Sequence, residues 1–127
     1  MPGLNRPSQS PENRALRNRK NAATANGRAN RLLHTAKRRG LECTITQEWI
    51  RDKLEQPCPR TGWVFDLSTG SGRNLKSPSL DQIEPGKGYT PENTQVVCWG
   101  YNAAKSTGTD ADVVALAEAI LNVRTRH

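Results

Sequence analysis

Residues 77–105 read SPSLDQIEPGKGYTPENTQVVCWGYNAAK, and this stretch decides the fold. Two short strands are predicted in it, over 79–83 and 95–98. The connection between them contains two Gly and two Pro, which favour a tight loop rich in turns. A helix is expected to open at residue 101 and to continue to residue 105. The stretch therefore predicts a two-stranded ribbon followed by a helix, within an α+β domain.

This ribbon and helix bring three polar side chains toward one point. Asp81 and Gln82 belong to the first strand, and Asn102 belongs to the first turn of the helix. Hard cations such as Mg²⁺ take oxygen ligands and keep open positions for phosphate and water. Asp81 and Asn102 are therefore candidate ligands of Mg²⁺ or Mn²⁺, and such an ion stabilises charge on a phosphate and its leaving oxygen. Taken alone, an Asp and an Asn at this spacing are more often surface residues.

The letters around these residues carry a family resemblance. The pattern S-L-D-Q-I-E-P-x-K-G-Y-T-x-x-N-x-x-V-V-C-x-x-x-N-x-A-K resembles the ββα-metal motif of HNH, or His-Me finger, endonucleases. More narrowly, the chain is similar to small phage-type HNH-like proteins with an S-L-D-x-I strand, a basic LL-x-x-AKRRG helix and the motif C-P-x-T-G-x-x-F-D-L. The similarity covers residues 31–105. It implies a ββα core at 78–106 with flanking helices, and metal-dependent nicking or cleavage of DNA.

The resemblance also implies a role for each matching residue. Asp81 and Asn102 would bind the metal, and Asn93 would brace the hairpin through hydrogen bonds. Gln82 stands where the family has its general-base histidine, and Lys105 would meet a phosphate. The residues expected to form the catalytic group are therefore Asp81, Gln82, Asn93 and Asn102.

The glutamine at position 82 is a departure with a chemical cost. Its amide does not accept a proton near neutral pH, and general-base catalysis contributes about 10²–10⁴-fold. The sequence predicts a slow endonuclease or, as the alternative, a catalytically weak or inactive nucleic-acid-binding protein that retains the HNH fold. For the endonuclease, the replacement base stays open among a metal-activated water, a substrate phosphate and His34. Tyr89 or Tyr101 acting as a covalent nucleophile is a further option.

A second departure concerns zinc. Many HNH proteins hold a structural zinc with two Cys-x-x-Cys pairs, and the corresponding positions here are Cys58 with Thr61 and Cys98 with Tyr101. Because a structural zinc needs four ligands, we expect no structural zinc in this chain. Apolar packing is expected in its place, from Trp63, Phe65, Cys98 and Trp99.

Basic residues are concentrated in the first third of the chain. Residues 1–40 hold ten Lys and Arg against one acid, whereas residues 41–127 hold nine against eleven. Phosphate contacts release counterions from nucleic acid, so DNA is the expected partner and RNA is not excluded; a solubilising tail is the plainer alternative. We expect a flexible basic arm over 1–27 and an HNH-like domain over 28–127. The expected phosphate contacts are Arg28, Arg31, Lys37, Arg38, Arg39, Lys87 and Lys105.

Helical patterns flank the central stretch. A helix is expected over 28–39 and is ended by Gly40, and a second helix begins after Thr46 as its cap. Residues 63–65 are expected to form a strand. Asp110 is expected to cap a last helix, whose apolar face would consist of Val113, Leu116, Ala117, Ile120 and Leu121.

Composition limits the setting of the protein. Residues 1–6 do not resemble a signal peptide, and the longest apolar run, 113–117, is too short to cross a bilayer. The three cysteines have no disulfide-framework spacing. We therefore expect a cytoplasmic protein, in a bacterial or phage-infected cell, with no membrane partner. Monomer and homodimer both stay open.

Overall fold

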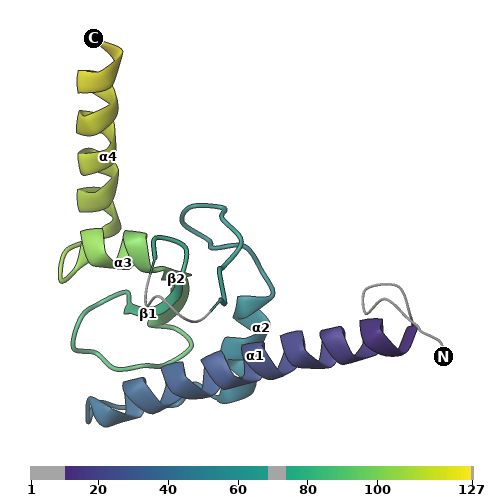
Figure 1. The fold of residues 1–127 in the computed structure, drawn as a ribbon. Helices are drawn as coiled ribbons and strands as arrows, with labels where there is room; N and C mark the ends of the chain where they lie inside the picture. Colours follow the sequence, from purple (N-terminus) through teal and green to yellow (C-terminus); the bar gives the residue numbers. More distant parts are fainter. Residues whose placement is uncertain (1–10, 69–73, 127) are drawn as a thin grey trace.

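A computed structural model describes residues 11–68 and 74–126, of which 11–24 are described as backbone only. In this part of the chain a two-stranded antiparallel sheet lies among four helices, so the α+β class is confirmed. Figure 1 shows their arrangement along the chain. The elements are α1 (Pro11–Arg38), α2 (Gln47–Leu54), β1 (Pro78–Gln82), β2 (Thr94–Cys98), α3 (Trp99–Lys105) and α4 (Asp110–Thr125).

The hairpin and α3 form the ribbon-and-helix unit that the sequence predicts. Strands β1 and β2 pair with Asp81 opposite Gln95. Helix α3 follows β2 directly, and its first N–H groups donate to the backbone before β1, Trp99 to Ser77 at 2.7 Å and Gly100 to Leu75 at 3.0 Å. These bonds hold the start of α3 against the residues that lead into β1.

The loop between the strands docks on the segment that follows α1. The N–H of Tyr89 donates to the carbonyl of Glu42 at 2.7 Å, and the N–H of Thr44 donates to the carbonyl of Tyr89 at 2.9 Å. Gly88 has a φ of 98°, and a Cβ there would lie 2.9 Å from the Glu42 carbonyl oxygen. Only glycine fits this close approach without displacing the backbone.

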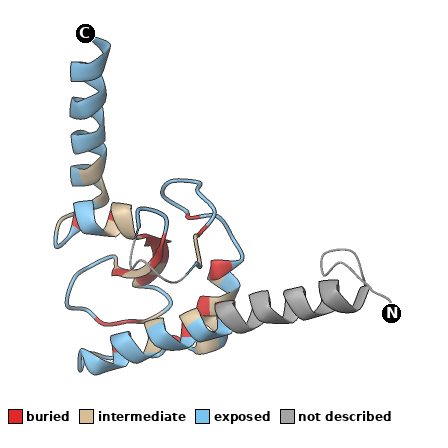
Figure 2. Ribbon diagram, in the orientation of Figure 1, coloured by how far each residue is buried: buried red, intermediate tan, exposed pale blue. Residues whose placement is uncertain are grey.

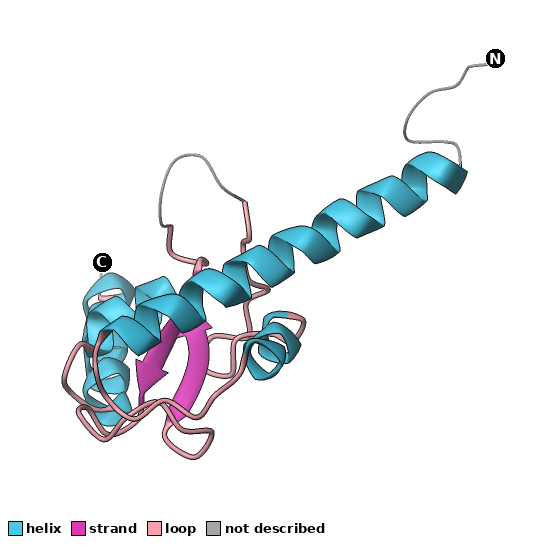
Figure 3. Cartoon of the chain, turned by 90° about the horizontal axis from the view of Figure 1, so that it is seen from below, coloured by secondary structure: helices cyan, strands magenta, loops and turns pink. Residues whose placement is uncertain are grey.

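The core lies between the hairpin and the two helices α1 and α2, as the views from two sides show (Figures 2 and 3). The face of α1 that carries Ala29 and Ala36 packs against this core, and both residues are buried. Thr46 caps α2 by accepting from the Trp49 N–H, as expected. Gly40 follows α1 with a φ of 75°, the left-handed conformation that ends helices. The side chains with the least exposure are Ile50, Val97, Cys58 and Cys98.

Helix α1 begins much earlier than the sequence patterns indicate. It starts at Pro11, so the helix runs through the expected boundary at residue 28. Proline suits a first helical position, and extending an anchored helix costs far less than nucleating one. Contact with α2 also extends earlier, because the Gln47 side chain donates to the Asn26 carbonyl at 3.1 Å. The expectation for 1–10 lies outside the described residues.

The strand expected over 63–65 is absent. The Cys58 N–H donates to the Trp63 carbonyl at 2.8 Å, and the Gly62 N–H donates to the Cys58 carbonyl at 2.8 Å. These bonds close a turn, so the backbone at Trp63 is used there and not in a sheet. Trp63 and Val64 are exposed, whereas Phe65 and Cys98 join the core, so the expected packing is right for only part of the set. Trp99 is half-buried.

Helix α4 differs from expectation in its cap and in its face. Thr109, and not Asp110, is the N-cap: its hydroxyl accepts from the Asp112 N–H, and the Asp112 carboxylate accepts from the Thr109 N–H. Most of the predicted apolar face is exposed, with Leu116 at 50% and Ile120 at 51%. Figure 1 shows the reason, since α4 leaves α3 pointing away from the sheet and the other helices. No described helix has both the length and the apolar character needed to span a membrane.

We expect the free energy of unfolding to separate two otherwise similar leucine substitutions. Leu54→Ala empties a buried position on α2, which costs about 2–5 kcal/mol. Leu116→Ala changes an exposed position on α4 and should alter the free energy by less than about 0.5 kcal/mol. Urea denaturation measures both. A loss at Leu116 as large as that at Leu54 would show that α4 packs against the body of the protein.

Candidate functional site

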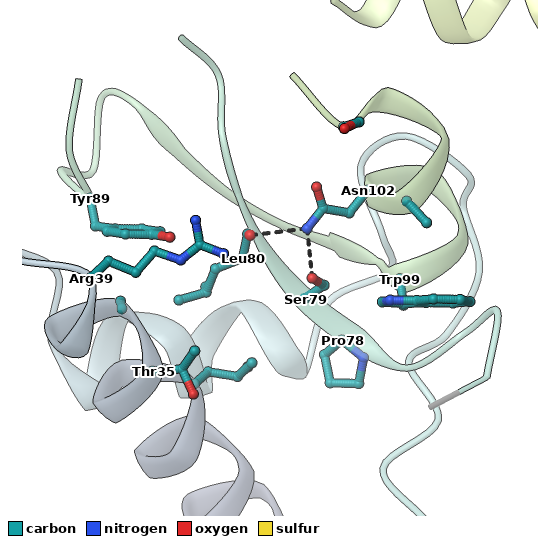
Figure 4. Close-up of a pocket in the computed structure, with 12 residues that line it drawn as sticks. Thr35, Arg39, Pro78, Ser79, Leu80, Tyr89, Trp99 and Asn102 are labelled. Carbon is teal, nitrogen blue, oxygen red and sulfur yellow. Dashed lines mark hydrogen bonds between the residues drawn. The ribbon is translucent and has the colours of Figure 1, made fainter. Parts of the chain in front are cut away.

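A cleft lies between the C-terminal half of α1 and the hairpin with α3. It consists of two neighbouring cavities of about 410 and 280 Å³. Figure 4 shows the larger one. Thr35 of α1 and Arg39, which directly follows α1, lie on one side, and Ser79 and Asn102 lie on the other. Asp81 and Gln82 line the smaller cavity. The residues that line both are Arg39, Leu80, Tyr89, Asn102 and Ser106.

Asn102 is held by its amide nitrogen. Nδ2 donates to the Ser79 hydroxyl at 2.7 Å and to the Leu80 carbonyl at 3.1 Å, so α3 is tied to β1 at this point. Both donors are used in these bonds, and Oδ1 is the remaining polar atom of the side chain. Figure 4 shows this oxygen directed away from the two partners. Asn102 therefore offers an acceptor oxygen to the cleft.

Asp81 is buried and fully engaged. Its side chain is 3% exposed, and Oδ1 lies 3.1 Å from the Nζ of Lys105, whose side chain is also 3% exposed. Oδ2 accepts from the amide of Gln95 at 2.8 Å. Lys105 donates further to the Gln82 carbonyl at 3.0 Å. The lysine that the resemblance assigns to a phosphate thus pairs with the carboxylate that it assigns to a metal.

Gln82 uses its side chain to hold the loop between the strands. Its Oε1 accepts from the backbone N–H of Gly86 at 3.1 Å and from that of Gly88 at 3.0 Å. A histidine in this place would offer a ring nitrogen for proton transfer, whereas this oxygen is already occupied by two donors. In this structure Gln82 is a loop-bracing residue.

Asn93 holds the same loop from the other strand. Its Oδ1 accepts from the Glu84 N–H at 2.9 Å, and its Nδ2 donates to the carbonyls of Glu84 at 3.1 Å and Gly88 at 2.9 Å. These are the bracing hydrogen bonds that the resemblance implies. Gln82 and Asn93 together fix the loop that docks on the segment after α1.

The expected phosphate contacts fall into different environments. Arg28 donates to the carbonyls of Leu67 and Ser68, each at 3.3 Å, so it ties α1 to the following loop. Burial, and then the charge of Arg31, lowers the pKa of its guanidinium. Lys105 is buried at Asp81. The remaining members are exposed and free to meet a polyanion: Arg31, Lys37, Arg38, Arg39 and Lys87.

The alternative bases and nucleophiles lie in three different environments. Tyr101 donates its hydroxyl to Asp110 at 2.6 Å. Burial, followed by this hydrogen bond, raises the pKa of Tyr101 to about 12, so its reactive phenolate is scarce at neutral pH. Tyr89 is buried and lines the cleft with its ring. His34 is exposed on α1.

Three of the four positions that correspond to zinc ligands come together, whereas the fourth, Tyr101, has its hydroxyl at Asp110. The N–H of Cys98 donates to the sulfur of Cys58 at 3.3 Å, and the Thr61 hydroxyl lies 3.6 Å from the sulfur of Cys98. Burial opposes ionisation of Cys58, but hydrogen bonds from Thr61 and from nearby backbone N–H groups outweigh it and lower the pKa of the thiol. Hydrogen bonds therefore connect Cys58, Thr61 and Cys98 in this structure.

The donor set tests whether a divalent cation suits this site. Asp81 and Asn102 both line one cavity, and carboxylate and amide oxygens are the ligand types that Mg²⁺ or Mn²⁺ prefers. Among the described side chains no cluster of three or more His, Cys, Asp or Glu gathers. The ammonium group of Lys105 already lies beside the Asp81 carboxylate, where a cation would bind. The oxygens therefore fit such an ion in kind, while the lysine competes with it for Asp81.

Two contributors to the site escaped the sequence patterns. Gln95 holds Asp81, and its place follows from the strand register, since the two residues are directly opposite each other. Ser79 holds Asn102 from the same strand as Asp81. The register of the hairpin would have revealed Gln95, but nothing in the spacing of Ser79 indicated its partner.

Comparison with known proteins supports the fold. No family model matches the chain, and no curated protein matches it by sequence. Among solved structures, the chain is similar to the rare-cutting HNH restriction endonuclease PacI, with a TM-score of 0.56 and 19% sequence identity over 78% of each chain. The report of that structure describes a mechanism of DNA perturbation. The HNH-like fold expected from the sequence is thereby confirmed.

Tyr101 should make stability fall at high pH. Because the folded-state pKa of this phenol is raised from 10 to about 12, its contribution is complete below pH 10 and is lost as pH rises toward 12. Tyr101→Phe should lose about 1–2 kcal/mol at pH 8, and its deficit should shrink between pH 10 and 11.5. Urea denaturation at several pH values measures this. Tyr89→Phe is the matched control, and a deficit for Tyr101→Phe that stays constant with pH would contradict the assignment.

Proposed function

We propose that this chain is an HNH-like endonuclease that hydrolyses DNA slowly in the cleft between α1 and the hairpin. One observation carries the proposal: Asp81 of β1 and Asn102 of α3 line a single cavity of about 280 Å³ on an HNH-like fold. The two residues stand in the positions that the motif reserves for its metal ligands. The cavity is also open to α1, which carries the densest basic segment among the described side chains.

DNA is the substrate class that the charges favour. Arg39 lines both cavities, and Lys37 and Arg38 are exposed just before it. A backbone phosphate that enters the cleft from the α1 side meets these cations first. Such contacts supply affinity and register but little sequence information. The structural relative, for which DNA perturbation is described, makes DNA the first choice over RNA.

Asp81 and the Oδ1 of Asn102 would hold Mg²⁺ or Mn²⁺ in this reading. The ion would supply a Lewis acid that stabilises negative charge on the phosphate and the leaving oxygen. Ser79 and Leu80 orient Asn102 for this task, since they take both of its amide donors. Gln95 orients Asp81 in the same way.

The chain supplies positioning and little proton transfer. The Oε1 of Gln82 is occupied by two backbone donors, and the Tyr101 hydroxyl is engaged with Asp110. The proton of an attacking water is therefore left to the substrate phosphate or to solvent. Loss of a positioned base lowers the rate by about 10²–10⁴-fold relative to a site that has one. We infer slow cleavage for that reason.

A second candidate is a nucleic-acid-binding protein without the reaction. It is favoured by the engagement of both Asp81 oxygens, which leaves no carboxylate oxygen facing a metal while Lys105 stays in place. In this candidate the cleft binds a phosphate backbone and releases it unchanged. The basic segment of α1 would serve both candidates equally.

Plasmid nicking separates the two candidates. Supercoiled plasmid incubated with the protein and Mn²⁺ or Mg²⁺ should be converted slowly to the open circle, and EDTA should stop the conversion. Asp81→Asn keeps the shape of the side chain but removes its charge, so it should lower the nicking rate at least about 10²-fold. Agarose gels report the conversion with time.

Glu84→Gln is the matched control for nicking. It removes the charge of an exposed carboxylate near the end of β1, outside the cleft, and should keep the wild-type rate. Metal-dependent nicking that is equal in the wild-type protein and in Asp81→Asn would end the endonuclease proposal. Tight DNA binding without any nicking would support the second candidate.

The salt dependence of DNA binding tests the role of α1. Replacing Lys37 and Arg38 by Ala should lower the slope of log affinity against log salt by up to about 2, since each phosphate contact contributes about 0.9. Fluorescence anisotropy with a labelled duplex measures the slope. Arg124→Ala with Arg126→Ala removes the same charge from the end of α4 and should change the slope much less. An equal effect of the two double variants would refute phosphate binding by α1.

A further inference from the structure

Lys105 places a positive charge beside Asp81, the carboxylate that lines the cleft. Its ammonium lies 3.1 Å from Asp81 Oδ1 and 3.0 Å from the Gln82 carbonyl, and both charged side chains are 3% exposed. An ion pair removed from water in this way is stable only while both partners remain, because either charge alone is costly to bury. The pair is thus an internally neutral unit beneath the cleft.

A divalent cation cannot simply join this unit. With Lys105 in place, an ion bound by Asp81 would raise the buried local charge from zero to plus two, and two cations would share one carboxylate. Like charges at such separations in a poorly solvated site repel strongly. Occupation of Asp81 by a metal therefore requires that Lys105 leave it.

A DNA phosphate would give Lys105 a new partner. Asn102 and Asp81 line the cleft that a phosphate enters, and Lys105 lies one helical turn after Asn102 on α3. An ammonium is a strong donor to phosphate oxygens and has three N–H groups, of which the present contacts use two. Moving it from carboxylate to phosphate exchanges one ion pair for another and frees Asp81.

We propose that Lys105 is an exchange residue that couples metal binding to DNA binding. Without DNA it neutralises Asp81 and keeps metal affinity low; with a phosphate in the cleft it pairs with the phosphate, and Asp81 accepts the divalent cation. This inference rests on the proposed function for the identity of the two ligands. It adds that the protein without DNA binds metal weakly, so the complete site forms only on its substrate.

Linkage makes the coupling measurable without any cleavage. If DNA raises the affinity for Mn²⁺ by some factor, Mn²⁺ raises the affinity for DNA by the same factor. Mn²⁺ binding is followed by electron paramagnetic resonance of the free ion, with and without a saturating 20-base-pair duplex. Asp81→Asn with the same duplex reports the Mn²⁺ bound by the DNA itself, which is subtracted. We expect the wild-type protein to gain at least tenfold in Mn²⁺ affinity.

Lys105→Met tests the residue itself. Methionine has a similar length and no charge, so Asp81 is free of its competitor. This variant should bind Mn²⁺ at least tenfold more tightly than wild type in the absence of DNA, and the gain on adding DNA should shrink. Lys53→Met is the matched control: it removes a lysine from α2, where its ammonium lies over the Trp49 ring, and should behave as wild type.

Three results would overturn the proposal. They are a wild-type Mn²⁺ affinity that DNA leaves unchanged, a Lys105→Met protein that binds Mn²⁺ no more tightly than wild type, and a Lys105→Met protein that keeps the full gain with DNA. The first result needs no variant, so the proposal stays testable if Lys105→Met fails to fold. Coupling without nicking would refute the endonuclease proposal and support the exchange role of Lys105. Nicking without coupling would support the endonuclease proposal and refute the exchange role.

Discussion

The buried ion pair between Asp81 and Lys105 is the constraint on which the site depends. It joins the first strand of the hairpin to the end of the helix that follows the second strand, across 24 residues of sequence. Because a buried charge without a partner is costly, the two charged groups must stay in contact, and this contact fixes the position of the end of α3 over β1. Asn102 lies one turn earlier on the same helix, and its hydrogen bonds to Ser79 and Leu80 complete the alignment.

A second set of polar contacts connects the hairpin to the opposite side of the cleft, which α1 and the segment after it form. Gln82 and Asn93 hold the loop between the strands from opposite sides, and the loop in turn binds the backbone at Glu42 and Thr44. That segment follows α1 and the cleft residue Arg39, which lies directly after the helix. Gln82 thus helps to shape the cleft, because the loop that it braces connects the hairpin to the basic helix.

The sequence predicted the parts of the protein whose signals are local. The two strands of the hairpin, the cap at Thr46 and the end of α1 at Gly40 depend on neighbouring residues, and each of these predictions held to within two residues. The strand expected over 63–65 did not form. The residues of the site were predicted as a set of positions, but the hydrogen bonds and the ion pair among them were not. Whether Lys105 faces a phosphate or Asp81 depends on side-chain packing across 24 residues, which no spacing encodes. The expected face of α4 failed similarly, since an apolar stripe indicates a preference for burial and not a partner.

The exposed position of helix α4 affects how the protein unfolds. Among its side chains only Val113 packs on the core, and its start is fixed by the Thr109 capping box and by Asp110, which receives the Tyr101 hydroxyl. An isolated helix of this length is marginal in water, and segments with few buried contacts open separately from the core. The protein thus contains two cooperative units. Amide hydrogens of α4 will exchange, and proteases will cut it, long before the hairpin and its buried ion pair are exposed.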